Sequence, residues 1–380
     1  MSTLKNQLNE PEKLKILVVG QTPPPYGGQA IMIDHIVNGE YKKIQIFHIR
    51  MCFSKEMNEK GLFNLYKITH LFEIILKIYF LKFKHNIKIL YYPPSNSPKT
   101  SIYRDMIILL PTRFLFKRII FHFHAAGLSE EYIHLNKIER FLARIVYNKP
   151  DLSIANSRFN PDDGAFFQSK INLFLPCGIP DNYPKNNEKV FFNGSGTLNI
   201  LFVGLLNSTK GEGYLLEAVS MLVKKGYQIK LRIAGVFETD EYKARFYARM
   251  HELNMEDSFE HLGVIKGETK NQAFLNTDIF CFPSFFVSES LGVVLLEAMQ
   301  YRLPIVATRW RGIQSIVEND VNGFLVDIKN ASQIADKLEY YIKNPKVIKQ
   351  FGESGRKMFC EKYTLSAYLN SIENEFYQLG

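Results

Sequence analysis

Residues 278–308, DIFCFPSFFVSESLGVVLLEAMQYRLPIVAT, decide the fold of this 380-residue chain. The apolar run DIFCFPS (278–284) is typical of a buried strand, and residues 290–301 have apolar side chains at helical spacing. A second apolar run, PIVAT (304–308), follows at once. A strand, a helix and a strand in this order predict one unit of a parallel sheet, because parallel strands need a long crossover connection.

The same alternation recurs in both halves of the chain. We expect further strands at 15–20, 43–50, 88–93, 119–125, 152–157, 199–204, 229–235, 259–263 and 324–327. We expect helices at 30–39, 62–85, about 130–148, 211–225, 240–253 and 290–301, and more at the C-terminus. The pattern predicts an α/β fold of two Rossmann-like, doubly wound domains that face a central cleft.

The segment NYPKNNEKVFFNGSGT (182–197) is polar and rich in Asn and Gly, and it separates the two halves. We therefore expect an N-terminal domain at 1–185, a linker at 186–198 and a C-terminal domain at 199–362. A final helix at 363–380 is expected to pack back on the N-terminal domain.

Composition excludes several classes of protein. A charged fraction of 22% with 30 Phe and 20 Tyr excludes an intrinsically disordered chain. The four Cys have no Cys-x-x-Cys spacing, which argues against a zinc ribbon or a disulfide scaffold and indicates reduced thiols. The start of the chain lacks a signal-peptide pattern, and no stretch of 18 apolar residues exists. We expect a cytoplasmic protein without a membrane span.

The positive charge gathers in one stretch. The net charge is +9, and residues 41–120 hold 15 Lys and Arg against 4 Asp and Glu. Such a surface attracts nucleic acid, anionic lipid or a phosphorylated substrate. Residues 61–88 combine Lys with apolar residues at helical spacing, which fits a core helix with a solvated Lys face. It also fits a helix that docks on anionic lipid at the inner face of the cell membrane, aided by the cations of residues 113–118.

Two carboxylates in the segment 282–308 point to a polyol ligand. Glu289 precedes a helix expected to start near 290–292, and Glu297 lies eight residues further, roughly 12 Å along a helix. The helix N-terminus offers N–H groups to phosphate, Gly292 allows close backbone approach, and each carboxylate can accept hydroxyl hydrogen bonds. The alternative is that both are ordinary helix charges.

Two glycine-containing loops are candidate phosphate sites. Lys210-Gly211 follows the strand 199–204 and precedes a helix, which places an ammonium beside helix N–H groups. Gly27-Gly28 lie between the first strand and the first helix, where their N–H groups can face a ligand. The alternatives are an ordinary helix start and a simple turn. Neither loop is a dinucleotide fingerprint, since no GxGxxG occurs.

His122 and His124 lie on the same side of the strand 119–125, where a His that is neutral near pH 7 can hydrogen-bond a ligand. The alternative for each is a structural histidine of the strand. Together with Asp162 and Asp163 they fit no known spacing of metal ligands, so we expect no metal and no cofactor.

The segment around Glu289 and Glu297 resembles a known family. Glu289 and Glu297 match the Glu-x7-Glu motif of retaining nucleotide-sugar glycosyltransferases with the GT-B fold, and their surroundings are similar to glycosyltransferase family 4. The likeness extends through LEAMQYRLPIVATRWRGIQSIVENDVNGFLV (296–326), which is similar to the family's LEAM, PVVAT and Gly-Gly pattern. It covers nearly the whole second half specifically and the first half more loosely.

The resemblance implies a role for each matching residue. Glu289 would contact the donor sugar and Glu297 the ribose, while the backbone of Ser290, Leu291, Gly292 and Val293 would hold sugar and phosphate. His124 would bind the sugar near the reacting carbon, Lys210 the diphosphate, and the main chain near Ile265 the nucleobase. The remaining implied donor contacts are those of Gly27, Gly28, Gly178 and Gly204.

Two positions depart from the family pattern. The family has Arg where this chain has Leu205, so part of the phosphate charge must be met in another way. It often has Asp where this chain has Ala125. Some members of the family also use lipid-linked acceptors, and these have a basic, apolar face in the N-terminal domain.

The resemblance implies hexosyl transfer, with retention, from a nucleotide-diphospho-sugar to a sugar hydroxyl of a glycan or lipid-linked acceptor, in bacterial surface polysaccharide or lipopolysaccharide synthesis. The alternatives are an inverting transferase or nucleotide-sugar epimerase of the same fold, an inactive lipid-binding relative, and a basic nucleic-acid-binding protein. The last leaves the Glu pair unexplained, so we expect no nucleic-acid partner.

Overall fold

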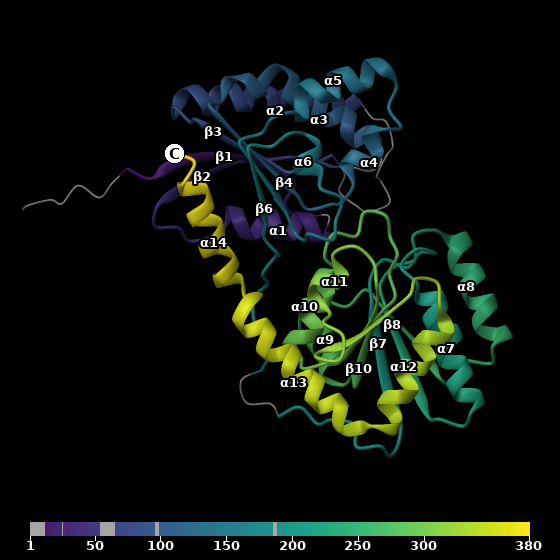
Figure 1. Cartoon of the computed structure of the whole chain (residues 1–380). Helices are drawn as coiled ribbons and strands as arrows, with labels where there is room; N and C mark the ends of the chain where they lie inside the picture. Colours follow the sequence, from purple (N-terminus) through teal and green to yellow (C-terminus); the bar gives the residue numbers. More distant parts are fainter. Residues whose placement is uncertain (1–11, 25, 54–64, 96–98, 185–187) are drawn as a thin grey trace, which may run out of the picture.

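The computed structural model describes residues 12–24, 26–53, 65–95, 99–184 and 188–380. Residues 61–64 of the basic segment and 186–187 of the predicted linker lie outside the described residues. The described residues form two sheets of six parallel strands, with helices on both faces of each sheet (Figure 1). This is the α/β fold of two doubly wound sheets that the sequence predicted.

The first sheet has the strand order β2-β1-β3-β4-β5-β6. Its strands are β1 Leu14–Gly20, β2 Ile44–Arg50, β3 Ile89–Tyr92, β4 Arg118–Phe123, β5 Leu152–Ala155 and β6 Ile171–Phe174. The helices of this part are α1 Gly28–Val37, α2 Leu65–Lys84, α3 Lys99–Thr112, α4 Leu128–Tyr132, α5 Lys137–Tyr147 and α6 Asp163–Phe166.

The second sheet has the order β12-β11-β10-β7-β8-β9. Its strands are β7 Leu198–Val203, β8 Ile229–Ala234, β9 Phe259–Gly263, β10 Ile279–Phe282, β11 Ile305–Thr308 and β12 Gly323–Val326. The helices that follow are α7 Glu212–Lys224, α8 Asp240–Glu252, α9 Gly267–Leu275, α10 Val293–Gln300, α11 Ile313–Ile316, α12 Ala331–Lys343, α13 Pro345–Lys362 and α14 Leu365–Tyr377.

The central strands are apolar on both sides because each sheet lies between two layers of helices. In β1, Ile16 and Val18 pack into one core with α1 and α14, while Leu17 and Val19 pack into another with α2, α3 and α5. All four side chains are fully buried. Strand order reverses beside β1 and beside β7, and sheets of this kind form a crevice at such a reversal, beyond the carboxyl ends of the strands.

The structure corrects two element predictions and contains elements that the sequence analysis did not predict. The helix expected at 130–148 is two helices, because Asn136 and Glu139 form a capping box that starts α5. The helix expected from 290 begins at Val293, after Gly292 in a left-handed conformation with φ +76°. The sequence analysis missed α3, which contains Pro111 in its last turn, and the short, mostly exposed β6.

The C-terminus crosses from the second sheet to the first (Figure 1). Helix α13 buries Ile348 and Phe359 in the core around the second sheet, whereas α14 buries Ile372 and Phe376 against the first. The Glu373 carboxylate accepts a hydrogen bond of 2.5 Å from the backbone N–H of Lys43. The last helix is therefore part of the N-terminal core.

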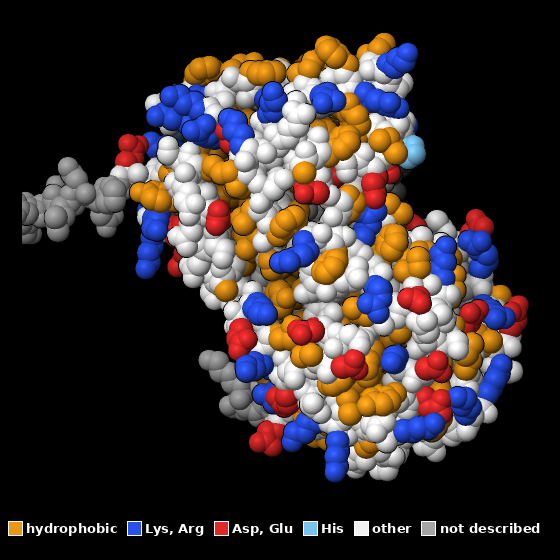
Figure 2. Space-filling view, viewed as in Figure 1, with side chains coloured by type: hydrophobic (Ala, Val, Ile, Leu, Met, Phe, Trp, Pro, Cys, Tyr) orange, Lys and Arg blue, Asp and Glu red, His pale blue; other side chains and the backbone are white. Residues whose placement is uncertain are grey.

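The outer face of the first sheet is apolar and basic. Figure 2 shows hydrophobic side chains along the top of the molecule, over α2, α3 and α5 in Figure 1, with Lys and Arg beside them. In α2, Ile74 and Ile78 are buried, so one face of the helix belongs to the core. Its other face carries large apolar side chains that are at least 60% exposed: Phe72, Leu76, Phe80 and Phe83. No described helix is long and apolar enough to cross a bilayer.

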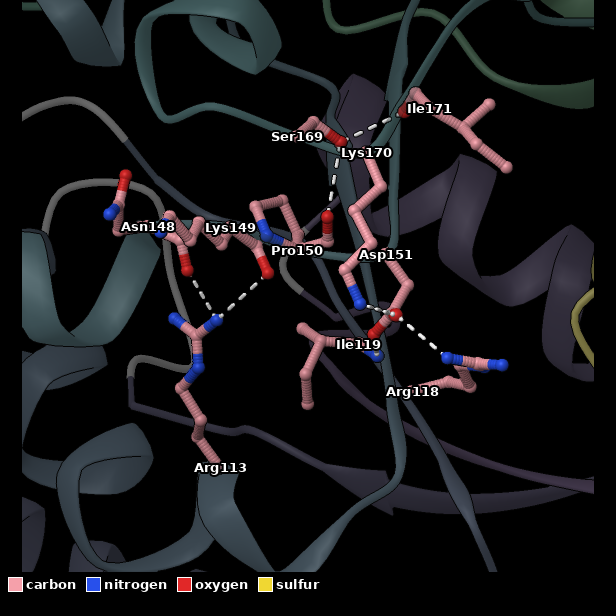
Figure 3. Close-up of polar contacts among 10 residues, drawn as sticks. All are labelled: Arg113, Arg118, Ile119, Asn148, Lys149, Pro150, Asp151, Ser169, Lys170 and Ile171. Carbon is pink, nitrogen blue, oxygen red and sulfur yellow. Dashed lines mark hydrogen bonds and ion pairs between the residues drawn. The ribbon is translucent and has the colours of Figure 1, made fainter.

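Arg113, one of the cations of residues 113–118 that were expected to face lipid, has a different role. Arg113 has 8% relative exposure, and its guanidinium donates to the backbone carbonyls of Ile145 and Val146 in the last turn of α5. It also donates to the carbonyls of Asn148 and Lys149, which follow the helix (Figure 3). The expectation that Arg113 assists docking on lipid is therefore wrong: its charge satisfies the last carbonyls of a helix. Nearby, Arg118 forms an ion pair with Asp151 at 3.2 Å.

Candidate active site

A lysine and a glutamate meet at the crevice of the second sheet. Lys210 comes from the loop after β7 and Glu289 from the loop after β10, the two strands beside the reversal of strand order. The Lys210 Nζ lies 2.6 Å from Glu289 Oε2, and the two side chains are 15% and 10% exposed. The structure thus brings together two residues that are 79 positions apart.

The two loops are fixed to each other. The backbone N–H of Phe285 donates to the carbonyl of Thr209 at 2.8 Å, and the Ser284 hydroxyl donates to Glu289 Oε2 at 3.1 Å. Gly211 has φ +84°, and a Cβ there would lie 2.1 Å from the carbonyl oxygen of Pro283. Only glycine allows this approach, which sets the position of the Lys210 loop.

Aromatic rings surround the ammonium of Lys210. Its Nζ lies 4.6 Å from the ring centroid of Phe286 and 5.7 Å from that of Phe282. These faces attract the cation and keep it near Glu289. Leu205, at the position of the family arginine, lies earlier in the same loop, and Gly204 follows β7 directly.

The N-terminus of α10 opens toward the first domain. Gly292 precedes the helix, and the Leu295 N–H already donates to the Gly292 carbonyl at 2.8 Å, which leaves the N–H groups of Val293 and Val294 without intrahelical acceptors. The segment before it is held across the domains: Asn156 Nδ2 donates to Ser290 Oγ at 3.0 Å, and Asn160 Nδ2 to the Ser290 carbonyl at 2.9 Å. The backbone of Ser290, Leu291, Gly292 and Val293 is therefore placed at the domain boundary.

Glu297 and Ile265 lie further along the second domain. Lys270 of α9 pairs with Glu297 of α10, with Nζ 2.6 Å from Oε1 and both side chains partly exposed. Ile265 follows β9 and lines a surface hollow of about 600 Å³ with Arg232, Gln272 and Asp278, among others. This hollow extends toward the amino ends of β7 and β10, away from Lys210 and Glu289, so we do not assign the site to it.

The two histidines of β4 belong to one hydrogen-bonded network. The Tyr91 hydroxyl lies 2.9 Å from His122 Nδ1 and 3.0 Å from His124 Nε2, and His122 Nε2 lies 3.4 Å from Asn156 Oδ1. All these groups are buried, and the two rings stack at 3.8 Å. Burial lowers the pKa of His122 to about 3 and that of His124 well below its usual range, the charge of His122 adding to the latter.

The network fixes which nitrogens carry hydrogen. Asn156 Nδ2 donates to Ser290, so Asn156 Oδ1 faces His122 and requires a hydrogen on His122 Nε2. His122 Nδ1 then accepts from the Tyr91 hydroxyl, whose oxygen accepts from His124 Nε2. The buried His124 Nδ1 is left as an acceptor without a partner among the described residues. It can accept a hydroxyl hydrogen.

The glycines of the first domain differ in their surroundings. A Cβ on Gly27 or Gly28 would meet nothing within 4 Å, and the neighbouring Tyr26 ring lies 4.7 Å from Lys266 Nζ across the domain boundary. Gly178 is buried, and a Cβ there would lie 2.4 Å from the Thr364 carbonyl oxygen. Gly178 thus has a packing role beside α14, and its contact with a donor stays a prediction.

Sequence reasoning missed several residues at this boundary. Among them, Glu212 begins α7 beside Lys210 and Gly211, and burial raises the pKa of its carboxyl group to about 7. In the sequence it resembles an ordinary helix-start charge. The sequence analysis also missed Arg311, Tyr91 and Asn156. Each of them has a hydrogen-bond partner that is remote in the sequence.

Fold and geometry define a two-domain GT-B protein with a charged crevice in the second domain. Residues 185–358 match the family model described as glycosyl transferases group 1. An uncharacterized glycosyltransferase of Haemophilus influenzae is 34% identical over 193 residues, which are 50% of this chain and 51% of that protein. The capsular polysaccharide biosynthesis glycosyltransferase CapM of Staphylococcus aureus is 27% identical over 46% of this chain and 44% of its own length. The chain spans about half the length of the curated relatives that it matches.

Solved structures show the fold over nearly the whole chain. The Anabaena protein Alr3699/HepE, in complex with UDP and glucose, superimposes with a TM-score of 0.72 and 16% identity. The superposition covers 96% of this chain and 99% of that chain. The lipopolysaccharide outer core galactosyltransferase WaaB has a TM-score of 0.66 and 16% identity, covering 97% and 100%. At this identity the likeness establishes the GT-B fold alone.

Proposed function

We propose that the protein is a retaining glycosyltransferase that moves a hexosyl unit from a nucleotide-diphospho-sugar to a sugar hydroxyl of a glycan or lipid-linked acceptor. The observation that carries this proposal is the Lys210–Glu289 pair at the crevice of the second sheet. A ligand with an anionic part and a polyol part would use both charges, with phosphate on Lys210 and hydroxyls on Glu289. CapM supports a role in bacterial surface polysaccharide synthesis.

The diphosphate gathers negative charge as the glycosidic bond breaks. Lys210 and the N–H groups at the start of α10 would stabilise this charge, and their positions are fixed before the substrate binds. The acceptor hydroxyl would attack from the face of the leaving group and pass its proton to the departing phosphate. This route needs neither a metal nor a cofactor, and none of the described carboxylates has to act as nucleophile.

The remaining residues orient the donor. His124 Nδ1 would accept a hydrogen bond from a sugar hydroxyl, because the network with Tyr91 leaves it as an acceptor. Glu297 would bind the ribose, and the main chain at Ile265 the nucleobase. For this, Lys270 must share Glu297 with the ribose or release it. The contact of Tyr26 with Lys266 would cover the nucleotide from the first domain.

A calorimetric titration with UDP, GDP and ADP tests the proposal. One of the three should bind with a dissociation constant in the micromolar range or below and raise the melting temperature, because ligand binding stabilises the folded state. When the sugar nucleotide of the base that binds is the donor, the transfer product should retain the anomeric configuration, as measured by NMR. Inverted configuration would favour the inverting enzyme, and the absence of binding by all three would contradict the proposal.

We also propose that the apolar and basic face over α2, α3 and α5 docks on an anionic membrane surface, where a lipid-linked acceptor would be found. The exposed side chains of α2 recur every three or four residues and so form one stripe along the helix. Lys82 and Lys84 lie within 6 Å of the rings of Phe83 and Phe80. Apolar side chains flanked by ammonium groups suit insertion at an anionic headgroup layer.

The double variant Leu76→Asp/Phe80→Asp should bind phosphatidylglycerol vesicles about 10- to 100-fold more weakly than the wild type in a sedimentation assay. It loses the burial of two large apolar side chains and adds like charge to the lipid. Val190→Asp, which changes a side chain that is 86% exposed in the linker, beside the second sheet, is the matched control. Equal binding of the double variant and the wild type would refute docking through this face.

A further inference from the structure

The loop after β11 places an arginine between the two domains. Arg311 has φ +41°, a conformation that favours glycine, and the family pattern has Gly-Gly where this chain has Arg311-Gly312. Its side chain is 8% exposed. Nη2 lies 2.6 Å from Oε2 of Glu130, which belongs to α4 of the first domain. A buried cation in an unfavoured backbone conformation points to a role at the domain boundary.

The guanidinium is only partly satisfied. Arg311 Nε and Nη1 are buried and have no hydrogen-bond partner among the described residues. Leaving charged donors buried and unpaired is costly, and a single bond to Glu130 uses one of five N–H groups. Nη1 lies 3.2 Å from the position that a Cβ on Gly127 would take. Gly127 therefore packs directly against this buried nitrogen, and a side chain at position 127 would crowd it.

The position of Arg311 is built into the second domain. The indole Nε1 of Trp310 donates to the Phe286 carbonyl at 2.9 Å, and the guanidinium lies 5.4 Å from the Trp310 ring centroid. Gly312 packs so closely that a Cβ would lie 1.7 Å from the Ser290 carbonyl oxygen. Arg311 is thus next to the residue that packs on the proposed sugar-binding backbone.

The first domain contributes to the same place. Gly127 lies three residues after His124, and Glu130 lies three residues after Gly127. The guanidinium consequently lies between the end of β4, which bears the proposed sugar-binding histidine, and the loop before α10. A group on a sugar bound between these two elements would be within the neighbourhood of Arg311.

We propose that Arg311 binds a carboxylate carried by a sugar substrate, so that the enzyme acts on a uronic acid. This inference rests on the proposed function. The planar guanidinium matches a carboxylate, and Glu130 already supplies one carboxylate oxygen to it in the absence of substrate. A substrate carboxylate would displace Glu130, which is half exposed, from Nη2. With its second oxygen it would then take Nε or Nη1, each of which shares one edge of the guanidinium with Nη2 and lacks a partner among the described residues.

The test compares acidic and neutral sugars on the wild type, Arg311→Gln, Glu130→Gln and the control Arg309→Gln. Arg309 is an exposed cation of the same loop. In the donor arm, titration calorimetry compares UDP-glucuronic acid with UDP-glucose, and GDP-mannuronic acid with GDP-mannose. In the acceptor arm, methyl glucuronide is compared with methyl glucoside on nucleotide-loaded protein. The arms distinguish a donor-borne carboxylate from an acceptor-borne one.

In one arm the wild type should prefer the acid by about 10- to 100-fold, the range of a hydrogen bond to a charged group. Arg311→Gln should lose this preference, Arg309→Gln should keep it, and Glu130→Gln should strengthen it because the competing carboxylate is gone. Binding of the nucleotide alone should change in none of the variants, which separates this result from a failure of the proposed function.

Two outcomes would overturn the inference. One is the absence of any preference for the acid in both arms, or a preference that survives in Arg311→Gln. The other is an equal weakening of acidic and neutral ligands in both Arg311→Gln and Glu130→Gln. That pattern would mean that the ion pair serves only to hold the two domains together.

Discussion

Lys210→Ala should lower the rate of sugar transfer by about 100- to 1,000-fold, the usual cost of removing one group that stabilises charge in a transition state. The ammonium lies in a crevice where its side chain is 15% exposed, so water replaces it poorly. The family that the chain resembles has a second cation at the position of Leu205. Since this chain has leucine there, the diphosphate would depend on Lys210 for a side-chain cation from this loop. Initial rates of nucleoside diphosphate release measure the effect.

Glu289→Gln is the companion variant. It keeps the size of the side chain and its contact with Ser284 but removes the charge that pairs with Lys210, and we expect a similar loss of transfer. Lys225→Ala, which removes an exposed lysine paired with Glu339, is the control and should retain activity. Circular dichroism must show both active-site variants folded. Wild-type rates in either folded variant would contradict the assignment of the site.

Gly312→Ala should reduce donor affinity and transfer together, by about 100-fold or more. The added methyl would lie 1.7 Å from the Ser290 carbonyl oxygen and 3.1 Å from the Leu291 Cα. These are backbone atoms, so the clash can be removed only by a shift of the segment that precedes α10. A displacement of about 1 Å in an active site lowers the rate by about 100-fold. Overpacking should also lower the free energy of unfolding by about 1–3 kcal/mol.

Gly213→Ala is the matched glycine substitution. Gly213 lies in α7, where a Cβ would meet nothing closer than the Tyr242 hydroxyl at 4.0 Å. Alanine there should stabilise the fold by about 0.5–1 kcal/mol, because glycine is the poorer helix residue. Urea unfolding measures stability, and calorimetry measures affinity for the nucleotide. If Gly312→Ala bound the donor as tightly as Gly213→Ala, the proposed position of the sugar would be wrong.

The strands could be predicted because the core strands of a covered parallel sheet are almost entirely apolar. The loop positions of Lys210 and Glu289 followed from the same reasoning, since both come directly after such strands and the carboxyl ends of parallel strands lie at one edge. The boundary of α5 was also predictable: Asn136 and Glu139 have the spacing of a capping box. The short exposed β6 has no such signal.

Contacts between the domains could not be predicted from one sequence. Asn156 meets Ser290 across 134 residues, and Glu130 meets Arg311 across 181. Their proximity depends on how two separately folded sheets approach each other, which no local pattern encodes. The prediction that Arg113 assists docking on lipid was wrong for a related reason. It lies near Lys117 and Arg118 in a basic stretch, but its acceptors are carbonyls more than 30 residues away.

The return of the chain to its first domain has a mechanical consequence. Two segments cross between the domains, and they are bonded side by side: Ile179 donates its N–H to the Tyr363 carbonyl, and Leu365 donates to the Ile179 carbonyl. A pair of joined crossings resists torsion and leaves bending about one line as the easy motion. Opening for product exit would therefore follow a single swing, with its pivot at Ile179 and Thr364.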